Sequence, residues 1–301
     1  MTQFDCNLGQ PEVPLPHVWS HPIGSRRVHL ALRADWQAQM RRVRAELGCR
    51  HVRFHAILSD DMGTVLIGQN QLLHGFYNAD QIFDFLVGIG MRPFVELSFM
   101  PTALASGEKT VFSFRGDITP PRDYEQWATL IRTLVSHWVV RYGADEVRQW
   151  FFEVWNEPNL SAFWSGGQDG YFTLYRTTVK ATNAVDSQLH VGGPASASDG
   201  WIKEFVDFCE REGLPADFVS THHYPIVAWL ERIDENHCNP RRLWESLGSS
   251  PYPDPAELDA LRAASELRRE VVAVQDTGDG IVFHLDVPPD GIACITLEFA
   301  T

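Results

Sequence analysis

Short apolar runs alternate with longer amphipathic stretches along most of the chain, a pattern typical of proteins that repeat a βα unit around a parallel sheet. The apolar runs predict strands, and the amphipathic stretches between them predict helices. The expected strands are 51–58, 92–99, 149–155, 189–194 and 218–223, with an opening strand within 17–32. The expected helices are 36–47, 79–89, 124–142, 170–185 and 201–212.

The fold expected from this pattern is α/β, a (β/α)8 TIM-type barrel that is incomplete, because about six strands are found where such a barrel has eight. Residues 16–230 are expected to form this partial barrel. After Pro225 the chain becomes polar and rich in proline, and its final stretch alternates in short runs broken by Asp-Gly and Pro-Pro turns. We therefore expect residues 231–301 to form a small accessory β-rich region, with residues 1–15 as a candidate addition to it.

Charge and hydropathy narrow the classes of partner. The 301 residues include 25 Lys and Arg against 39 Asp and Glu, a net charge of −14, so nucleic acid is not an expected partner. No apolar run approaches the roughly 20 residues that a membrane span requires. The first residues lack the basic and apolar regions of a signal peptide, and a cytoplasmic location is the expectation. An open barrel would expose strand edges, which favours a homo-oligomer.

Cysteine and histidine spacing gives no indication of a metal site or a disulfide framework. The five cysteines lie far apart without a Cys-x-x-Cys pair, and no His-Glu-x-x-His pattern occurs among the 12 histidines. We expect neither a metal nor any other cofactor.

The strongest chemical signal is at the end of the strand expected over 149–155, which runs into Trp155-Asn156-Glu157-Pro158-Asn159. Pro158 cannot donate to a strand ladder, so the strand must end there. In a β/α barrel the carboxyl ends of the strands form the active-site face. Glu157, set among aromatic side chains, would be partly shielded from water, which suits a general acid. The alternative is that Glu157 caps the next segment or pairs with a surface arginine.

The run Trp155-Asn156-Glu157-Pro158-Asn159 resembles the acid/base strand of glycoside hydrolase family 39, which includes β-xylosidases and α-L-iduronidase. Further segments resemble the same family in order along the chain, between Val28 and about Pro225. They are Arg53-Phe54-His55, the stretch from Gly90 to Pro101, and Thr221-His222-His223-Tyr224-Pro225. The resemblance implies a cofactor-independent retaining glycosidase with Glu157 as its catalytic acid/base.

By the same resemblance, a pocket for the terminal sugar would be lined by His55, Phe114, Asn156, His222 and Tyr224, with Asn156 bonding a ring hydroxyl. Taken singly, a histidine within a strand is more often a satisfied core residue, and an aromatic side chain is more often core than ligand.

Glu153 lies four residues before Glu157, so both side chains would point to the same face of a strand, and Glu153 could also point inward. For Glu153 we favour the role of a buried partner for an arginine.

The expected second carboxylate is missing. Retaining hydrolysis needs two carboxyl groups about 5 to 5.5 Å apart, and in family 39 the nucleophile is a Glu that ends the seventh strand. Here the match to the sixth strand is followed directly by residues 231–244, which resemble the accessory region of the family. Three explanations are open: an internal deletion, which we favour, a sequence from which a stretch was left out, and a compact variant that reuses another carboxylate such as Asp60, Asp61 or Glu96.

The expected function is hydrolysis of β-xylosides or xylo-oligosaccharides by a β-xylosidase-like enzyme, with a xylose-type sugar as the partner. The alternative is a catalytically impaired sugar-binding remnant that lacks the nucleophile. An endo-acting hydrolase of a related barrel family is disfavoured, because the matches outside Asn156 and Glu157 are specific to family 39.

Overall fold

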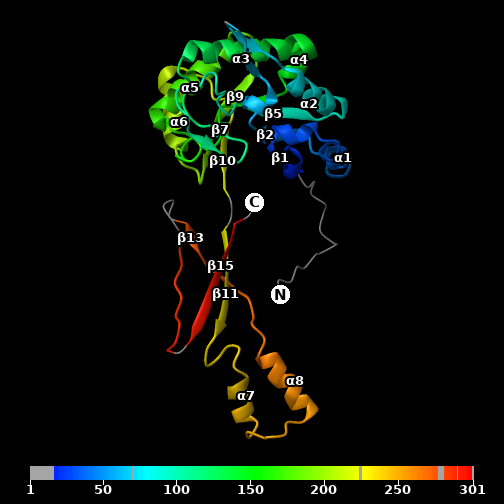
Figure 1. Cartoon of the computed structure of the whole chain (residues 1–301), viewed down its shortest axis with the longest axis vertical. Coiled ribbons are helices and arrows are strands. Elements are labelled where there is room, and N and C mark those ends of the chain that lie inside the picture. The colour runs from blue at the N-terminus through cyan, green and yellow to red at the C-terminus, as the bar shows by residue number, and fades with distance from the viewer. Residues whose placement is uncertain (1–16, 70, 224–225, 277–280, 290, 300–301) are drawn as a thin grey trace, which may run out of the picture. The chain divides into compact units, whose positions relative to one another are not determined.

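The computed structural model describes residues 17–69, 71–223, 226–276, 281–289 and 291–299 (Figure 1). The chain divides into two compact units between His222 and His223. This division lies earlier than the break after residue 230 expected from the sequence, because residues 226–230 pair with strands nearer the C-terminus.

The first unit is built on a parallel sheet of six strands that follow one another in chain order. The strands are β1 (Pro22–Arg27), β2 (His51–His55), β5 (Arg92–Glu96), β8 (Phe151–Glu153), β9 (His190–Ala197) and β10 (Val219–His222). The main helices between them are α1 (Ala34–Arg42), α2 (Tyr77–Gly88), α3 (Tyr124–Tyr142), α5 (Gly167–Asn183) and α6 (Ile202–Glu212), with the short α4 (Ala144–Val147) after α3. Because each strand is added beside the previous one, the sheet winds in one direction, as in a β/α barrel.

The α/β class expected from the periodicity is confirmed, and the sheet is curled like half of a barrel (Figure 1). Helix α3 shows why the pattern was informative. Its N-cap Asp123 accepts hydrogen bonds from the backbone N–H groups of Glu125 and Gln126. Its buried face recurs every three or four residues and comprises Trp127, Leu130, Ile131, Leu134 and Trp138. Trp127 also donates to Thr178 of α5 at 2.9 Å, which joins two neighbouring helices.

The loops that follow the strands carry the smaller elements of this unit. Short antiparallel pairs form between β3 (Val65–Ile67) and β4 (Leu72–His74) and between β6 (Thr110–Val111) and β7 (Gly116–Asp117). The second pair lies in the long connection from β5 to α3. Since parallel strands all end at the same edge of the sheet, these loops belong to the same face as the segment that follows β8.

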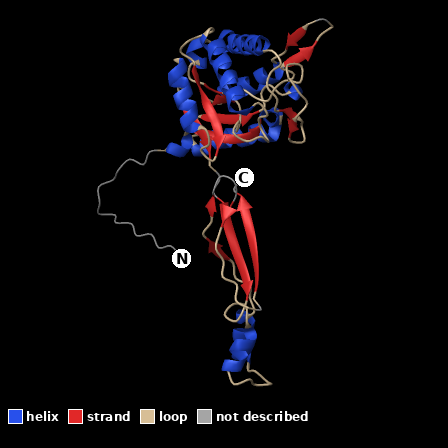
Figure 2. Ribbon diagram, turned by 90° about the vertical axis from the view of Figure 1, so that its left-hand side faces the viewer, coloured by secondary structure: helices blue, strands red, loops and turns tan. Residues whose placement is uncertain are grey.

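The second unit is antiparallel. Strand β11 (Ile226–Ile233) lies between β12 (Glu270–Val272) and β15 (Ile292–Phe299), and β13 (Gln275–Asp276) pairs with β14 (Ile281–Val282). Helices α7 (Pro240–Ser246) and α8 (Pro255–Ala264) form a helical pair at one end of this sheet (Figures 1 and 2). A capping box between Asp254 and Glu257 begins α8. Residues 1–15, expected as a candidate addition to this region, lie outside the described residues.

In the part of the chain that the structure describes, no helix is long and apolar enough to cross a bilayer.

Candidate active site

The backbone turns sharply where Glu157 follows β8. Trp155 and Glu157 both adopt the left-handed region, with φ of 73° and 46°, which side chains other than glycine rarely enter. Two hydrogen bonds hold this conformation. The backbone N–H of Glu157 donates to the carbonyl oxygen of Ala195 at 2.8 Å, and the indole N–H of Trp155 donates to the carbonyl oxygen of Phe163 at 2.8 Å. The packed aromatic surroundings thus fix a strained turn at the carboxyl edge of the sheet.

Glu157 contacts His222, although the two residues are far apart in sequence. Oε1 of Glu157 lies 2.8 Å from Nδ1 of His222, the last residue of β10. Glu157 is 8% exposed, so this contact is largely shielded from water. An ionised carboxylate only accepts hydrogen bonds, so the imidazole Nδ1–H donates when Glu157 is charged. That bond occupies one oxygen of Glu157, and no partner of the other oxygen occurs among the described residues, so this oxygen is available to a ligand.

A buried ion cluster ties three neighbouring strands together below this edge. Arg53 of β2 lies 2.9 Å from Glu96 of β5 and 2.7 Å from Glu153 of β8. Glu96 and Glu153 are paired in the strand register, and they are 0% and 1% exposed. Ser98 shares a hydrogen bond with the carboxyl group of Glu96. One guanidinium therefore faces two carboxyl groups in the interior.

This charge imbalance has a consequence for protonation. The pKa of Glu96 is raised to about 8, mainly by burial; the charge of Arg53 opposes the rise and the charge of Glu153 contributes to it. At neutral pH the carboxyl group of Glu96 is therefore mostly protonated.

Arg53 also orients Asn156. Its Nη2 donates to Oδ1 of Asn156 at 3.2 Å, and Asn156 is only 8% exposed. An amide whose oxygen is engaged in this way has its NH2 group available as a donor. Asn156 thus offers a hydrogen-bond donor next to Glu157, which is the geometry needed to bind a hydroxyl group.

His55 lies at the end of β2 within a group of three phenylalanine rings. Its ring is stacked on Phe112 with centroids 5.6 Å apart and on Phe114 at 6.2 Å, and the edge of Phe99 lies 6.0 Å away. The structure therefore brings together two residues, His55 and Phe114, that the sequence assigned to one pocket.

The protonation state of His55 follows from these surroundings. Burial, followed by the positive charges of Arg53 and Arg27, lowers the pKa of His55 to about 4, and His222 adds a smaller contribution of the same sign. His55 is therefore neutral at pH 7 and can both donate and accept a hydrogen bond.

Four of the predicted residues thus fall into two contacts, Glu157 with His222 and His55 with Phe114, and Asn156 joins the cluster of Arg53. Tyr224 lies outside the described residues. The interpretation of Glu153 as a buried partner of an arginine is confirmed by its pairing with Arg53. Catalytic and sugar-binding roles for the predicted residues stay predictions.

Sequence reasoning missed the part that Arg53 and Glu96 play in organising the site. Two signals were available. Arg53 and His55 lie two residues apart in one strand, so their side chains point to the same face of the sheet. Glu96 lies in an apolar strand, where a buried carboxyl group needs a partner.

Residues 6–228 match the family model of glycosyl hydrolases family 39. The chain belongs to this family. It is 52% identical over 225 residues to a β-xylosidase of Caldicellulosiruptor saccharolyticus, covering 74% of this chain and 46% of that relative. It is 44% identical over 217 residues to a β-xylosidase of Geobacillus stearothermophilus, covering 70% and 43%.

Solved structures agree with this assignment. A monomeric β-xylosidase from Caulobacter crescentus superposes with a TM-score of 0.70 at 37% identity, over 82% of this chain and 52% of that one. A family 39 enzyme from Xanthomonas axonopodis pv. citri gives a TM-score of 0.69 at 37% identity, over 81% and 50%. The chain spans about half the length of these two β-xylosidases and of these two solved chains.

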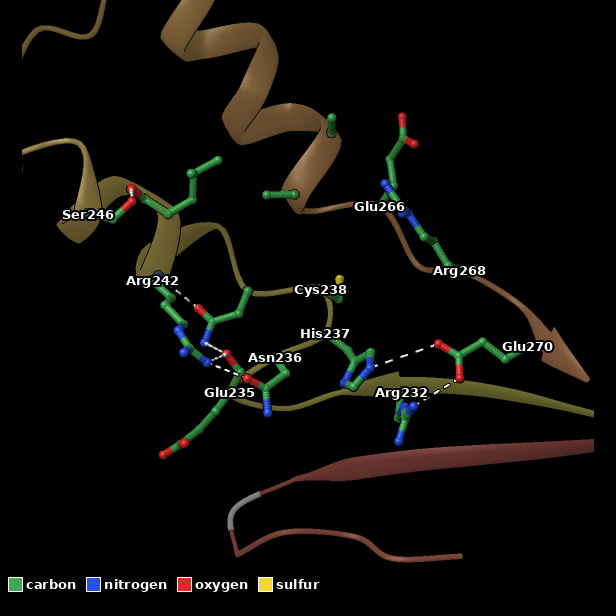
Figure 3. A pocket seen from close by; sticks show the side chains of 14 residues that line it. Arg232, Glu235, Asn236, His237, Cys238, Arg242, Ser246, Glu266, Arg268 and Glu270 are labelled. Carbon is green, nitrogen blue, oxygen red and sulfur yellow. Dashed lines mark hydrogen bonds and ion pairs between the residues drawn. The ribbon is translucent and has the colours of Figure 1, made fainter. Parts of the chain in front are cut away.

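The second unit contains a cavity of about 540 Å³ at the end of its sheet beside α7 and α8 (Figure 3). Its wall includes Arg232, which pairs with Glu270 at 2.9 Å, and His237, which lies 3.9 Å from the same carboxylate. This cavity holds none of the described residues predicted for catalysis, and it lies beyond residue 228, where the family match ends.

The first prediction concerns the proton on Glu96. The pKa of Glu96 is about 8 in the folded protein against its ordinary value of 4.5, so the folded state binds a proton that the unfolded chain releases. The free energy of unfolding should therefore contain a component that falls as pH rises from about 4.5 to about 8. Glu96→Gln, which mimics the protonated form, should remove this component in urea unfolding measured from pH 5 to pH 8.

Glu125→Gln on the exposed start of α3 is the matched control and should keep the pH dependence of the unsubstituted chain. Identical pH profiles for Glu96→Gln and the unsubstituted chain would contradict a protonated Glu96.

Proposed function

We propose that this chain has the acid/base half of the active site of a retaining β-xylosidase and recognises the substrates of such an enzyme, β-xylosides or xylo-oligosaccharides. The observation that carries the proposal is the buried Glu157 at the end of a central parallel strand, with one carboxylate oxygen 2.8 Å from His222 and with Asn156 beside it. The two relatives that are 52% and 44% identical are both named β-xylosidases, which supports the substrate class.

The proposed mechanism assigns a separate task to each polar group. His222 donates to Oε1 of Glu157, so the carboxyl group keeps one orientation, and Oε2 carries the proton to the glycosidic oxygen. In a complete retaining site the glycosyl group then passes to a second carboxylate, and the Glu157 carboxylate takes a proton from the water that hydrolyses this glycosyl-enzyme. The amide NH2 group of Asn156, whose oxygen is held by Arg53, donates to the hydroxyl next to the reacting carbon.

We also propose that the β/α barrel of this chain is incomplete. In the described residues the parallel sheet ends at β10, and the next strand, β11, pairs antiparallel with β12 and β15. We infer that the chain lacks the seventh and eighth βα units of a (β/α)8 barrel, and with them the glutamate that acts as nucleophile in the family.

Reuse of another carboxylate is disfavoured for two of the early glutamates, because Glu96 and Glu153 are both engaged by Arg53. This supports the second candidate function, a sugar-binding remnant with little or no turnover.

The second prediction tests the acid role in any hydrolysis that the chain performs. Glu157→Gln should slow hydrolysis most for substrates with poor leaving groups, since general acid catalysis contributes about 10² to 10⁴-fold. Activated aryl xylosides need less protonation and should be affected less. Steady-state rates for an alkyl and a nitrophenyl xyloside give the comparison, and equal losses on both substrates with glycosylation rate-limiting would argue against an acid role.

The third prediction distinguishes an active retaining enzyme from a sugar-binding remnant that lacks the nucleophile. Without a second carboxylate at about 5 to 5.5 Å no covalent glycosyl-enzyme can form, so a fluorinated xyloside that traps retaining nucleophiles should leave the mass of the chain unchanged. Intact-mass spectrometry after incubation measures this directly. A stoichiometric adduct, mapped to an Asp or Glu by peptide sequencing, would exclude the remnant and identify a substitute nucleophile.

A further inference from the structure

The end of β9 lies between the two residues of the contact between Glu157 and His222. Strand β9 has β8 as its neighbour on one side and β10 on the other. On the β10 side, Ala197 is the register partner of His222, and the N–H of Ser198 donates to the carbonyl oxygen of His222 at 2.9 Å. On the β8 side, the N–H of Glu157 donates to the carbonyl oxygen of Ala195 at 2.8 Å. The position of this strand end therefore sets how the Glu157 carboxyl group meets the imidazole.

The main chain alone does not continue the ladder between β8 and β9 beyond Glu157. Regular pairing ends at Glu153, and single bonds to β9 follow from the N–H groups of Val154 and Glu157. The next residue, Pro158, has no N–H with which to extend the ladder. The segment that carries Glu157 thus leaves the sheet at the point where its orientation matters most.

The side chain of Asn159 takes the place of the missing ladder bonds. Its Oδ1 accepts from the N–H of Ala197 at 2.8 Å, and its Nδ2 donates to the carbonyl oxygen of the same residue at 2.9 Å. A side-chain amide offers both an acceptor and donors, as a peptide group does, so this pair of bonds imitates one step of a strand ladder. Asn159 in this way joins the segment of Glu157 to the strand end that pairs with His222.

The turn that follows β9 is strained and begins at the same residue. Three of its residues adopt the left-handed region, with φ of 49°, 59° and 62°: Ser198, Asp199 and Trp201. A backbone of this kind keeps its shape only when its surroundings hold it. The carbonyl oxygen of Ala197 accepts from the N–H of Gly200 at 3.0 Å as well as from Asn159. The amide of Asn159 is therefore one of the contacts that hold the start of this turn.

Gly200 provides the space that the amide of Asn159 occupies. A Cβ added at Gly200 would lie 2.6 Å from Nδ2 of Asn159, which is closer than two such atoms approach. The φ of Gly200 is not positive, so its backbone is one that alanine can also adopt. The lack of a side chain at this position thus serves the fit of Asn159 and not a special backbone conformation.

We propose that Asn159 is a positioning residue for the acid/base group. It fixes the end of β9, and through the register of β9 with β10 it keeps the imidazole of His222 hydrogen bonded to Glu157. The inference rests on the proposed function, because the orientation of this carboxyl group matters for chemistry only if Glu157 is the acid/base. Asn159 acts on Glu157 through Ala197 and His222.

The Nδ1–H of His222 reports this contact in the full 301-residue chain without requiring turnover. In protein that contains isotopically labelled histidine, this proton should give an NMR resonance at pH 7, because a shielded hydrogen bond slows its exchange with water. His222→Asn identifies the resonance by its loss. Asn159→Ala should remove the resonance from a chain that circular dichroism shows to be folded. Asn159→Asp has nearly the same size but cannot donate to Ala197 when ionised, so it should not restore the resonance.

Gly200→Ala tests the same contact while Asn159 stays in place. Its added methyl group should displace the amide and remove the His222 resonance. Two matched controls should keep the resonance. Asn78→Ala deletes a bond of the same kind elsewhere in the first unit, from Nδ2 to the carbonyl oxygen of Met62 at 3.2 Å. Gly88→Ala adds a methyl group that meets nothing within 4 Å.

Persistence of the His222 resonance in folded Asn159→Ala or Gly200→Ala would overturn the positioning role. Its absence from the unsubstituted chain would do so too, as would its loss in Asn78→Ala, because the effect would then not depend on the contact with Ala197. Titration of the unsubstituted chain with xylose keeps the proposed function apart from this test. A chain that shows the expected changes in the resonance but does not bind xylose would overturn the proposed function and leave the link from Asn159 to His222 standing.

Discussion

The candidate site depends on one partly buried arginine, Arg53. Arg53 bridges three adjacent strands by pairing with Glu96 and Glu153, and the same guanidinium holds the oxygen of Asn156. Removing one partner from a buried ion pair leaves an uncompensated charge, which typically costs about 3 to 5 kcal/mol. The same group that balances interior charge therefore also positions the amide beside Glu157.

Sheet topology explains how residues distant in sequence share this site. Each parallel strand is added beside the one before it, so the ends of β2, β8 and β10 lie along one edge. His55, Glu157 and His222 are presented there by three separate strands.

Much of the fold was predictable because the spacing of apolar residues along the chain reflects which side chains are buried. The helix expected over 124–142 matches α3, and the strand expected over 218–223 contains β10. The segment Trp155-Asn156-Glu157 was also found from sequence, since an apolar strand that ends at a proline is a local signal. The hydrogen bond from Arg53 to Asn156 was not predictable, because it joins residues about a hundred positions apart through register and side-chain direction. The division at His222 was also missed, since an apolar run of strand residues does not reveal which sheet it joins.

The central claim is that Arg53 prepares the sugar site by holding Asn156. The most direct measurement is the affinity of xylose for Arg53→Met, at a temperature where circular dichroism shows that the variant is folded. The account predicts an affinity about tenfold lower than that of the unsubstituted chain, because a charge-assisted hydrogen bond that fixes the amide is lost. A folded Arg53→Met variant that binds xylose as tightly as the unsubstituted chain would contradict it.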